Sequence, residues 1–373
     1  MPPISNRSLP PLPAHPRGLA WPTHDWPEAE PTEVGGDSAR LGELLDELVD
    51  GERHPTLGLT HAAAVVAGGR LVAERYGRRV VPDLRSREPD PALEDVTASS
   101  ELLSWSMAKS ITHLAVGVAV ADGCVDIHEP VPDPRWSEPG DERAAITWDH
   151  LLAMQPGLAW TEEYYGLVGG ALPDVLTMLF GTESRDMAAY AASFPLVRAP
   201  GSDDAYNYSS GTTNIVAANL QRALDLDGAA MDSFLHERIF APVGMTSARA
   251  EFDAAGTFIG SSYVYATLRD WCRFALLAIR GGAWDGRALV PPGWIDHGRT
   301  ARSWDEDMFH GAHWWTWDLE EMPFGAHGFQ GQRVVAFPRR DVVVVRLGQT
   351  HADQPSNLNA HLLQIAECFP VLP

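Results

Sequence analysis

Two candidate β-hairpins lie at opposite ends of the chain, and this arrangement constrains the fold more than any other feature of the sequence. The segment HAAAVVAGGRLVAERYG (61–77) predicts two strands joined by Gly68-Gly69, a dipeptide typical of two-residue hairpin turns. The segment QRVVAFPRRDVVVVRLG (332–348) predicts a second hairpin, turning between Pro338 and Asp341. From about residue 99 to 240 the patterns are mostly helical. We therefore expect a sheet assembled from both ends of the chain.

This organisation predicts an α/β (α+β) fold, in which helices flank an antiparallel sheet and an all-helical subdomain is inserted into the chain. The sheet subdomain would comprise residues 37–98 and 241–373, and the helical subdomain residues 99–240. We expect the active site between the two. A helix over 39–52 would cover the sheet with one apolar stripe, formed by Leu41, Leu44, Leu45, Leu48 and Val49.

Residues 1–36 are rich in proline, which excludes a regular helix or a central strand. The same segment carries Trp21 and Trp26, two large side chains whose apolar surface is more stable when it is buried away from water. We expect an extended arm that packs on the body of the protein.

The charge and the cysteine content exclude several classes of partner. A formal net charge of −22 disfavours nucleic acid, which is itself a polyanion. The three cysteines are widely spaced, without a zinc-like pattern, which is typical of a reducing compartment: Cys124, Cys272 and Cys368. No apolar run approaches the ~20 residues of a membrane span, and no apolar signal-peptide core is evident. We expect a cytoplasmic monomer or homodimer with no membrane partner.

One lysine, Lys109, occurs in a chain whose other strongly basic side chains are all arginine. A guanidinium stays charged in any protein, whereas a buried ammonium can lose its proton. Ser106 lies three residues earlier, at the expected start of a buried helix that runs to about Gly123, so the two side chains should share one face. The positive end of the helix dipole would favour an anion that develops there.

A serine hydroxyl is a poor nucleophile until its proton is removed, and a neighbouring amine can assist in removing it. The S-x-x-K pattern at the start of a buried helix matches the motif of β-lactamases and penicillin-binding proteins. The chain resembles this serine β-lactamase and penicillin-recognising superfamily over residues 55–370. The closest branch comprises class C β-lactamases, esterases and 6-aminohexanoate-oligomer (nylon oligomer) hydrolases. The segments that carry the likeness, in family order, are SWSMAKSITHLAVGVAVADG, HLLAMQPGLAWTEEY, YNYSSGTTNIVAANL, SSYVYATLRDWCRF and HGFQGQRVVAFP.

The resemblance implies a β-lactamase/transpeptidase-like fold and a tyrosine just before a helix. In NYSSGTTN that tyrosine is Tyr208, and Ser210 stands where the family usually has asparagine, a substrate-binding position. Tyr206 is the rival by sequence proximity. A tyrosinate held near an ammonium could take the serine proton and return it to the leaving group. Whether Lys109 or Tyr208 is the formal base stays open.

The family's third element is a strand bearing K-T-G or a relative of it. The segment GAHGFQGQ places Ala326, His327 and Gly328 at these positions, with Phe329 next. The resemblance implies that the backbone N–H groups of Ser106 and Phe329 form an oxyanion hole. His327 would either contact substrate or have a purely structural role in the strand, and Gly328 would line the substrate site.

Two further cleft residues follow from the resemblance. The loop GLAWTEEYYG matches a segment that lines the cleft, with Tyr164 as the preferred wall residue and Tyr165 next. Ser261, in GSSYVYATLRD, lies where relatives present a cleft residue. His310 and His313 have no adjacent carboxylate or cysteine in a metal-like signature, so we expect strand-edge residues and no metal site.

The resemblance implies a serine hydrolase that acts on ester or linear amide bonds of small molecules through a Ser106 acyl-enzyme, without metal or organic cofactor. A β-lactamase or D-amino-acid peptidase is the alternative within the family. A catalytically silent binding protein on the same fold is the alternative of another class, although the serine, lysine and tyrosine are all present. The sequence lacks the G-x-S-x-G elbow of α/β-hydrolases and the Walker P-loop.

Overall fold

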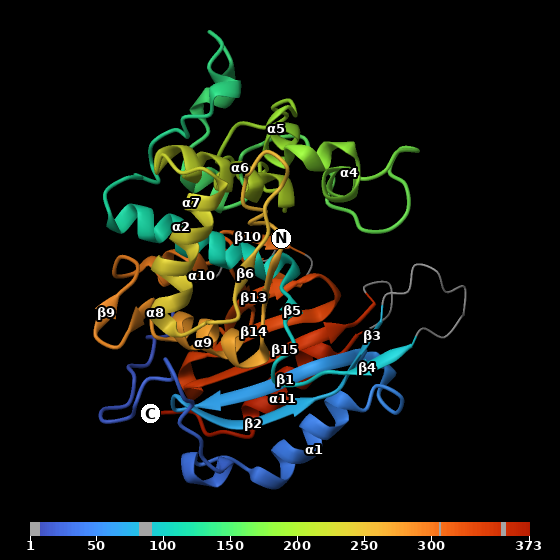
Figure 1. Cartoon of the computed structure of the whole chain (residues 1–373), viewed down its shortest axis with the longest axis vertical. Coiled ribbons are helices and arrows are strands. Elements are labelled where there is room, and N and C mark those ends of the chain that lie inside the picture. Colours follow the sequence, from blue (N-terminus) through green and yellow to red (C-terminus); the bar gives the residue numbers. More distant parts are fainter. Residues whose placement is uncertain (1–7, 82–91, 306, 352–355) are drawn as a thin grey trace.

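A computed structural model describes residues 8–81, 92–305, 307–351 and 356–373 of the chain. Its centre is an eight-stranded antiparallel sheet in the order β10-β11-β12-β13-β14-β15-β1-β2 (Figure 1). The strands are β1 (Leu59–Ala67), β2 (Arg70–Tyr76), β10 (Ser303–Asp305), β11 (Met308–His310), β12 (Trp315–Trp317), β13 (Phe324–Gly328), β14 (Gln332–Phe337) and β15 (Val342–Gln349). Because β1 pairs with β15, both ends of the chain meet in one sheet, which confirms the predicted fold class.

Both predicted hairpins are present. Gly68 and Gly69 have φ values of 57° and 76°, and positive φ at both central residues is what a type I′ turn requires. The second hairpin joins β14 to β15 through a 3-10 turn over Pro338–Arg340, and Asp341 follows with φ 50°.

Helices cover both faces of the sheet. The apolar side chains of β1 alternate: Ala62 and Ala64 join the core beneath α9 (Leu268–Ile279), whereas Ala63 and Val65 face α1 (Ser38–Val49) and α11 (Leu358–Glu367). A strand buried on both faces is apolar at nearly every position, which explains the continuous AAAVVA run.

Helix α1 confirms the predicted stripe in four of its five positions. The four buried leucines are Leu41, Leu44, Leu45 and Leu48, whereas Val49 is partly exposed at the last turn. The Asp37 carboxylate accepts a hydrogen bond from the backbone N–H of Arg40 (3.0 Å) and caps the helix.

The helices between residues 108 and 243 lie mainly on the α9 side of the sheet, above it in Figure 1. They are α2 (Ala108–Ala121), α3 (Trp148–Leu152), α4 (Asp174–Phe180), α5 (Met187–Ala192), α6 (Ser210–Ala223), α7 (Gly228–Leu235) and α8 (Ala241–Val243), followed later by α10 (Trp294–Arg299). Short strands complete the structure: β3 (Arg78–Val80), β4 (Leu93–Asp95), β5 (Leu102–Leu103), β6 (Arg249–Ala250), β7 (Val264–Ala266), β8 (Ala283–Trp284) and β9 (Arg287–Ala288). The division into two subdomains stays a prediction.

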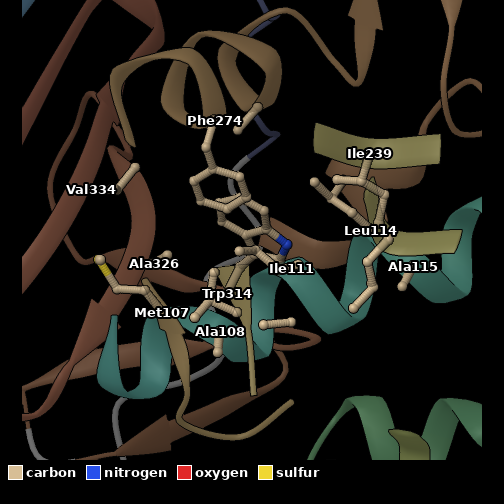
Figure 2. Packing of buried hydrophobic residues seen from close by; sticks show 14 of the residues in the cluster. Met107, Ala108, Ile111, Leu114, Ala115, Ile239, Phe274, Trp314, Ala326 and Val334 are labelled. Atoms are coloured by element: carbon tan, nitrogen blue, oxygen red, sulfur yellow. The ribbon is translucent and has the colours of Figure 1, made fainter. Parts of the chain in front are cut away.

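Helix α2 lies in the middle of this core. Figure 2 shows its first turns among side chains from α9 and the sheet region, including Phe274, Trp314 and Ala326. All of its residues from Ala108 to Ala119 are buried. The helix is therefore held from every side, which fixes the position of whatever its N-terminus carries.

The N-terminal arm is held by arginines of the body. Arg273 donates hydrogen bonds to the carbonyls of Pro22 (2.6 Å) and His24 (2.9 Å), and Arg299 donates to the carbonyl of Pro10 (2.5 Å). The Trp26 side chain is buried beside the Arg273 guanidinium. Each guanidinium also pairs with an aspartate of its own helix, Asp270 or Asp296, and the arm supplies the further acceptors that these buried groups need.

The expectation of strand-edge positions for His310 and His313 was wrong. His310 ends β11, an interior strand of the sheet, and His313 lies in the turn to β12 with φ 61°. Both side chains are almost fully buried. In the described part of the chain, no helix is long and apolar enough to cross a membrane.

We predict that removing residues 1–30 lowers the melting temperature by several degrees, because Arg273 and Arg299 lose the acceptors that the arm provides and the Trp26 site is exposed to water. Thermal unfolding followed by circular dichroism measures the change. Removal of residues 1–7 is the matched control, since it leaves Pro10, Pro22, His24 and Trp26 in place. Equal melting temperatures for the two truncated chains would show that the arm contributes nothing to stability.

Candidate active site

Ser106 lies in a tight 3-10 turn, Trp105–Met107, that leads directly into α2. Trp105 has a φ of 44°, in the left-handed region that a bulky residue adopts only under constraint. The constraint comes from Ser104, whose backbone N–H donates to the carbonyl of Val264 (2.8 Å) and whose hydroxyl accepts from the Val264 N–H (3.1 Å). Strand β7 therefore fixes the turn that presents Ser106.

Lys109 lies one helical turn after the serine, and its side chain is only 2% exposed. Its Nζ donates to Ser106 Oγ (3.0 Å), to Ser210 Oγ (2.9 Å) and to the Ser261 carbonyl (3.1 Å). Burial lowers the pKa of Lys109 from 10.5 to about 8, while the negative charge of Glu162 acts in the opposite direction. The amine therefore loses its proton far more readily than an exposed lysine does.

Tyr208 lies two residues before the start of α6, and its ring centroid lies 4.9 Å from Lys109 Nζ. Burial raises the pKa of Tyr208 well above its usual value, and a hydrogen bond with Ser106 opposes that rise. Tyr206, the rival, instead donates its hydroxyl proton to Asp305 Oδ2 (2.9 Å). The structure thus brings Ser106, Lys109 and Tyr208 together.

The end of strand β13 packs against the Ser106 turn. A Cβ at Gly328 would lie 2.3 Å from the Ser104 carbonyl oxygen, so only glycine allows this approach. Phe329 follows and makes an edge-to-face contact with Trp105 at 5.7 Å. Among the described residues, neither the Ser106 nor the Phe329 N–H donates to a backbone carbonyl in a turn, loop or cap. An oxyanion hole formed by these two N–H groups stays a prediction.

Tyr164 forms one wall beside Phe329. The two rings stack with centroids 4.5 Å apart, and the Tyr164 hydroxyl donates to Glu162 Oε1 (2.7 Å). Tyr165 approaches Phe329 less closely, at 6.0 Å, and is 48% exposed. Tyr164 is therefore the tyrosine of this loop that closes over the β13 end.

Three of the residues expected to bind substrate are buried. Ser210 lies between Lys109 and Glu162, and Ser261 contacts Lys109 through its carbonyl while its hydroxyl pairs with that of Ser262. His327 accepts a hydrogen bond at Nε2 from Trp317 Nε1 (3.3 Å), whereas its Nδ1 has no partner in the described structure.

Burial keeps the pKa of His327 well below 6.5, so the ring is neutral. Substrate contacts for Ser210, Ser261 and His327 stay predictions.

Glu162 is the site residue that the sequence did not reveal. Its carboxylate accepts hydrogen bonds from Trp160, Tyr164 and Ser210, and the last of these also contacts the Lys109 amine. In the sequence it is one of two adjacent acids in a loop, a pattern typical of a solvated surface. The only signal was indirect, since a buried lone lysine requires a compensating charge nearby.

In the described ranges, no three His, Cys, Asp or Glu side chains are grouped so that they could hold a metal ion. What the arrangement offers is a serine hydroxyl that accepts a hydrogen bond from a buried amine of lowered pKa. The neutral phenol of Tyr208 lies beside it. These are the components of nucleophilic acyl transfer.

Comparison with known proteins agrees with this geometry. Residues 43–366 match the family model named Beta-lactamase. The chain belongs to the β-lactamase family. It is therefore a hydrolase of the serine β-lactamase superfamily, as the S-x-x-K motif predicted.

Three individual proteins are similar to this chain. The 6-aminohexanoate-dimer hydrolase of Paenarthrobacter ureafaciens is 24% identical over 348 residues, which cover 88% of this chain and 83% of that protein. A candidate 6-aminohexanoate-dimer hydrolase of Bacillus anthracis superposes with a TM-score of 0.70 at 20% identity, covering 95% of this chain and 89% of that chain. A penicillin-binding protein of Bacillus halodurans gives 0.62 at 14% identity, over 88% of this chain and 100% of that chain.

We predict that Lys109 titrates near pH 8 in the folded protein, because burial disfavours its charged form. The single lysine makes this directly measurable: a chain labelled with ¹³C-lysine gives one side-chain NMR signal, whose shift is followed from pH 6 to 11. The urea-unfolded chain is the control and should titrate near 10.5. A folded-state titration at that same value would contradict the burial seen in the structure.

Proposed function

We propose that the protein hydrolyses ester or linear amide bonds of small molecules through an acyl-enzyme on Ser106, without a metal or organic cofactor. The observation that carries this proposal is the 3.0 Å contact between Lys109 Nζ and Ser106 Oγ at a buried, constrained turn. A base must lie within hydrogen-bonding distance of the proton that it removes, and Lys109 meets that condition.

The proposed reaction begins with transfer of the Ser106 proton to neutral Lys109. With a pKa of about 8, roughly a tenth of the amine is neutral at pH 7. Tyr208 is a less suitable initial base, because its raised pKa keeps the phenol protonated. Its hydroxyl can instead pass a proton between the lysine and the leaving group.

Ser106 Oγ then attacks the carbonyl carbon and forms a tetrahedral intermediate. The N–H groups of Ser106 and Phe329 would stabilise its oxyanion, and one such donor is worth roughly 3–4 kcal/mol of barrier. Collapse breaks the bond to the leaving alcohol or amine, which takes the proton held by Lys109. Water, deprotonated by the same amine, then attacks the acyl-serine; the bond to Ser106 Oγ breaks, the acid is released, and Oγ takes its proton back from Lys109.

The substrate side favours linear esters and amides. The position of the K-T-G lysine is occupied by Ala326, which is buried in the core and presents no charge. His327 is neutral, and Ser210 is committed to Lys109 and Glu162. The name of the relative from Paenarthrobacter ureafaciens, a hydrolase of a 6-aminohexanoate dimer, agrees with a linear amide.

A β-lactam or D-amino-acid peptide is the second candidate, and Arg333 is the observation in its favour. This arginine donates to the Gly328 carbonyl (3.2 Å) and lines a cavity of about 300 Å³ with Tyr164 and Phe329. Its Nε donates to Asn359 Oδ1 (3.0 Å), and the carboxylate of Asp307 acts on its charge. A guanidinium at this place could bind a substrate carboxylate.

We predict that a fluorophosphonate probe labels Ser106, because the probe phosphonylates serines whose hydroxyl proton is taken up by a neighbouring base, with loss of fluoride. Intact-protein mass spectrometry should show one adduct, and Ser106→Ala should remove it. Ser137→Ala, which alters an exposed serine, is the control and should keep it. An adduct that persists in Ser106→Ala would place the nucleophile elsewhere.

We predict that the best p-nitrophenyl ester has a higher kcat/KM than a chromogenic cephalosporin. Each lost charge-assisted contact costs about 1.5–3 kcal/mol, roughly 10- to 150-fold in binding. The screen comprises p-nitrophenyl esters, linear aminohexanoate oligomers, D-amino-acid amides and the cephalosporin, with Ser106→Ala as the blank. Faster turnover of the cephalosporin would instead favour the β-lactamase alternative and the role of Arg333 in carboxylate binding.

A further inference from the structure

The carboxylate of Glu162 receives an unusual number of hydrogen bonds for a loop residue. Trp160 Nε1 donates to it at 2.6 Å, the Tyr164 hydroxyl at 2.7 Å and the backbone N–H of Ser210 at 2.9 Å. The Ser210 hydroxyl also donates to it, at 2.5 Å. Four donors from two segments fix the position of this anion, so it is a built feature of the site.

The hydrogen bond from the Ser210 hydroxyl to Glu162 determines which atom donates and which accepts between Ser210 and Lys109. A serine hydroxyl has one proton to donate, and here that proton is directed at Glu162. Ser210 Oγ can therefore only accept from Lys109 Nζ, which lies 2.9 Å away. The Ser261 carbonyl, at 3.1 Å, is also solely an acceptor. Two of the three contacts of the amine thus always require an N–H.

The third contact of the amine is Ser106 Oγ. A protonated lysine has three N–H donors, one for each of its three acceptors. A neutral amine has two N–H donors and one lone pair. With Ser210 and Ser261 taking the two donors, the lone pair must point at Ser106 Oγ, where the proton to be removed is located.

We propose that Glu162 is a positioning residue: by holding the proton of Ser210, it directs the lone pair of neutral Lys109 at Ser106, and its charge stabilises the ammonium that forms. This inference rests on the proposed function, since it explains how the amine serves the Ser106 nucleophile.

The other titratable groups around Lys109 do not duplicate this role. Tyr208, on the loop before α6, is a neutral phenol whose ring faces the amine. His310, on β11, and His313, after it, are kept neutral by burial. Tyr164, on the Glu162 loop, is a neutral phenol as well.

Two further charged groups, Asp305 on β10 and Arg333 on β14, act on Tyr208. Among the described groups, Glu162 is the charge that acts on the Lys109 amine.

The test uses the full chain and the single ¹³C-lysine signal. We expect Glu162→Gln to lower the pKa of Lys109 by about one unit, because the ammonium loses its nearby negative charge. Glu163→Gln, which removes the same charge from the adjacent exposed position, is the matched control and should leave the titration unchanged. An unshifted Lys109 titration in Glu162→Gln would overturn the proposed charge stabilisation.

Kinetics test the orientation of the lone pair. We expect Glu162→Gln to lower kcat for the best ester at least ~10-fold with little change in KM, and to move the lysine-dependent limb of the pH profile to lower pH. Ser210→Ala keeps the carboxylate but removes the bridge, so it should lower kcat similarly while shifting the pKa of Lys109 less. Wild-type kcat in both variants would overturn the proposed orientation.

The two readouts also separate this inference from the proposed function. The NMR titration requires no turnover, so it tests Glu162 even if no ester or amide is hydrolysed. Absence of activity together with absence of a Ser106 adduct would overturn the proposed function alone. Melting temperatures establish that each variant is folded. If Glu162→Gln is unstable, Glu162→Asp provides the second test: it keeps the negative charge, so the pKa of Lys109 should stay close to its value in the unaltered protein.

Discussion

The burial of one ammonium group, that of Lys109, is the interaction on which the site depends. A charged amine removed from water is unstable unless its donors are satisfied and a counter-charge lies near. The acceptors come from Ser106, Ser210 and Ser261, which lie on three segments far apart in the sequence. The three acceptors therefore surround Lys109 only when these segments are packed together, so the site depends on the tertiary structure.

The sheet contributes through one close contact. Strand β13 ends at Gly328, where the absence of a side chain lets the strand approach the backbone of Ser104. That approach places Phe329 against Trp105, the residue whose left-handed backbone presents Ser106. Backbone strain of about 1–3 kcal/mol at Trp105 persists because β7 on one side and β13 on the other leave the turn no relaxed alternative. Sheet position and nucleophile geometry are thus coupled.

Features determined by local pattern could be predicted from the sequence. The hairpins, the leucine stripe of α1 and the i, i+3 relation of Ser106 to Lys109 each depend on the spacing of a few neighbouring residues. Strands β10, β11 and β12 have three residues each, too few for alternation to be recognised, and so the burial of His310 was missed. Glu162 was missed because Ser210, which donates to its carboxylate, and Lys109, on which its charge acts, are distant in sequence and only the fold brings them together.

The serine at position 210 shows why a family departure has to be judged in its surroundings. In the sequence alone, serine in place of asparagine is a lost amide contact to substrate. In the structure its hydroxyl connects Lys109 to Glu162: it accepts a hydrogen bond from the amine and donates one to the carboxylate. An amide carries donors and an acceptor on separate atoms, so its hydrogen bond to one neighbour would not fix the direction of its hydrogen bond to the other. In serine one hydroxyl makes both hydrogen bonds. Because its single proton is donated to Glu162, its oxygen can only accept from Lys109, and the orientation of the amine depends on the Glu162 carboxylate.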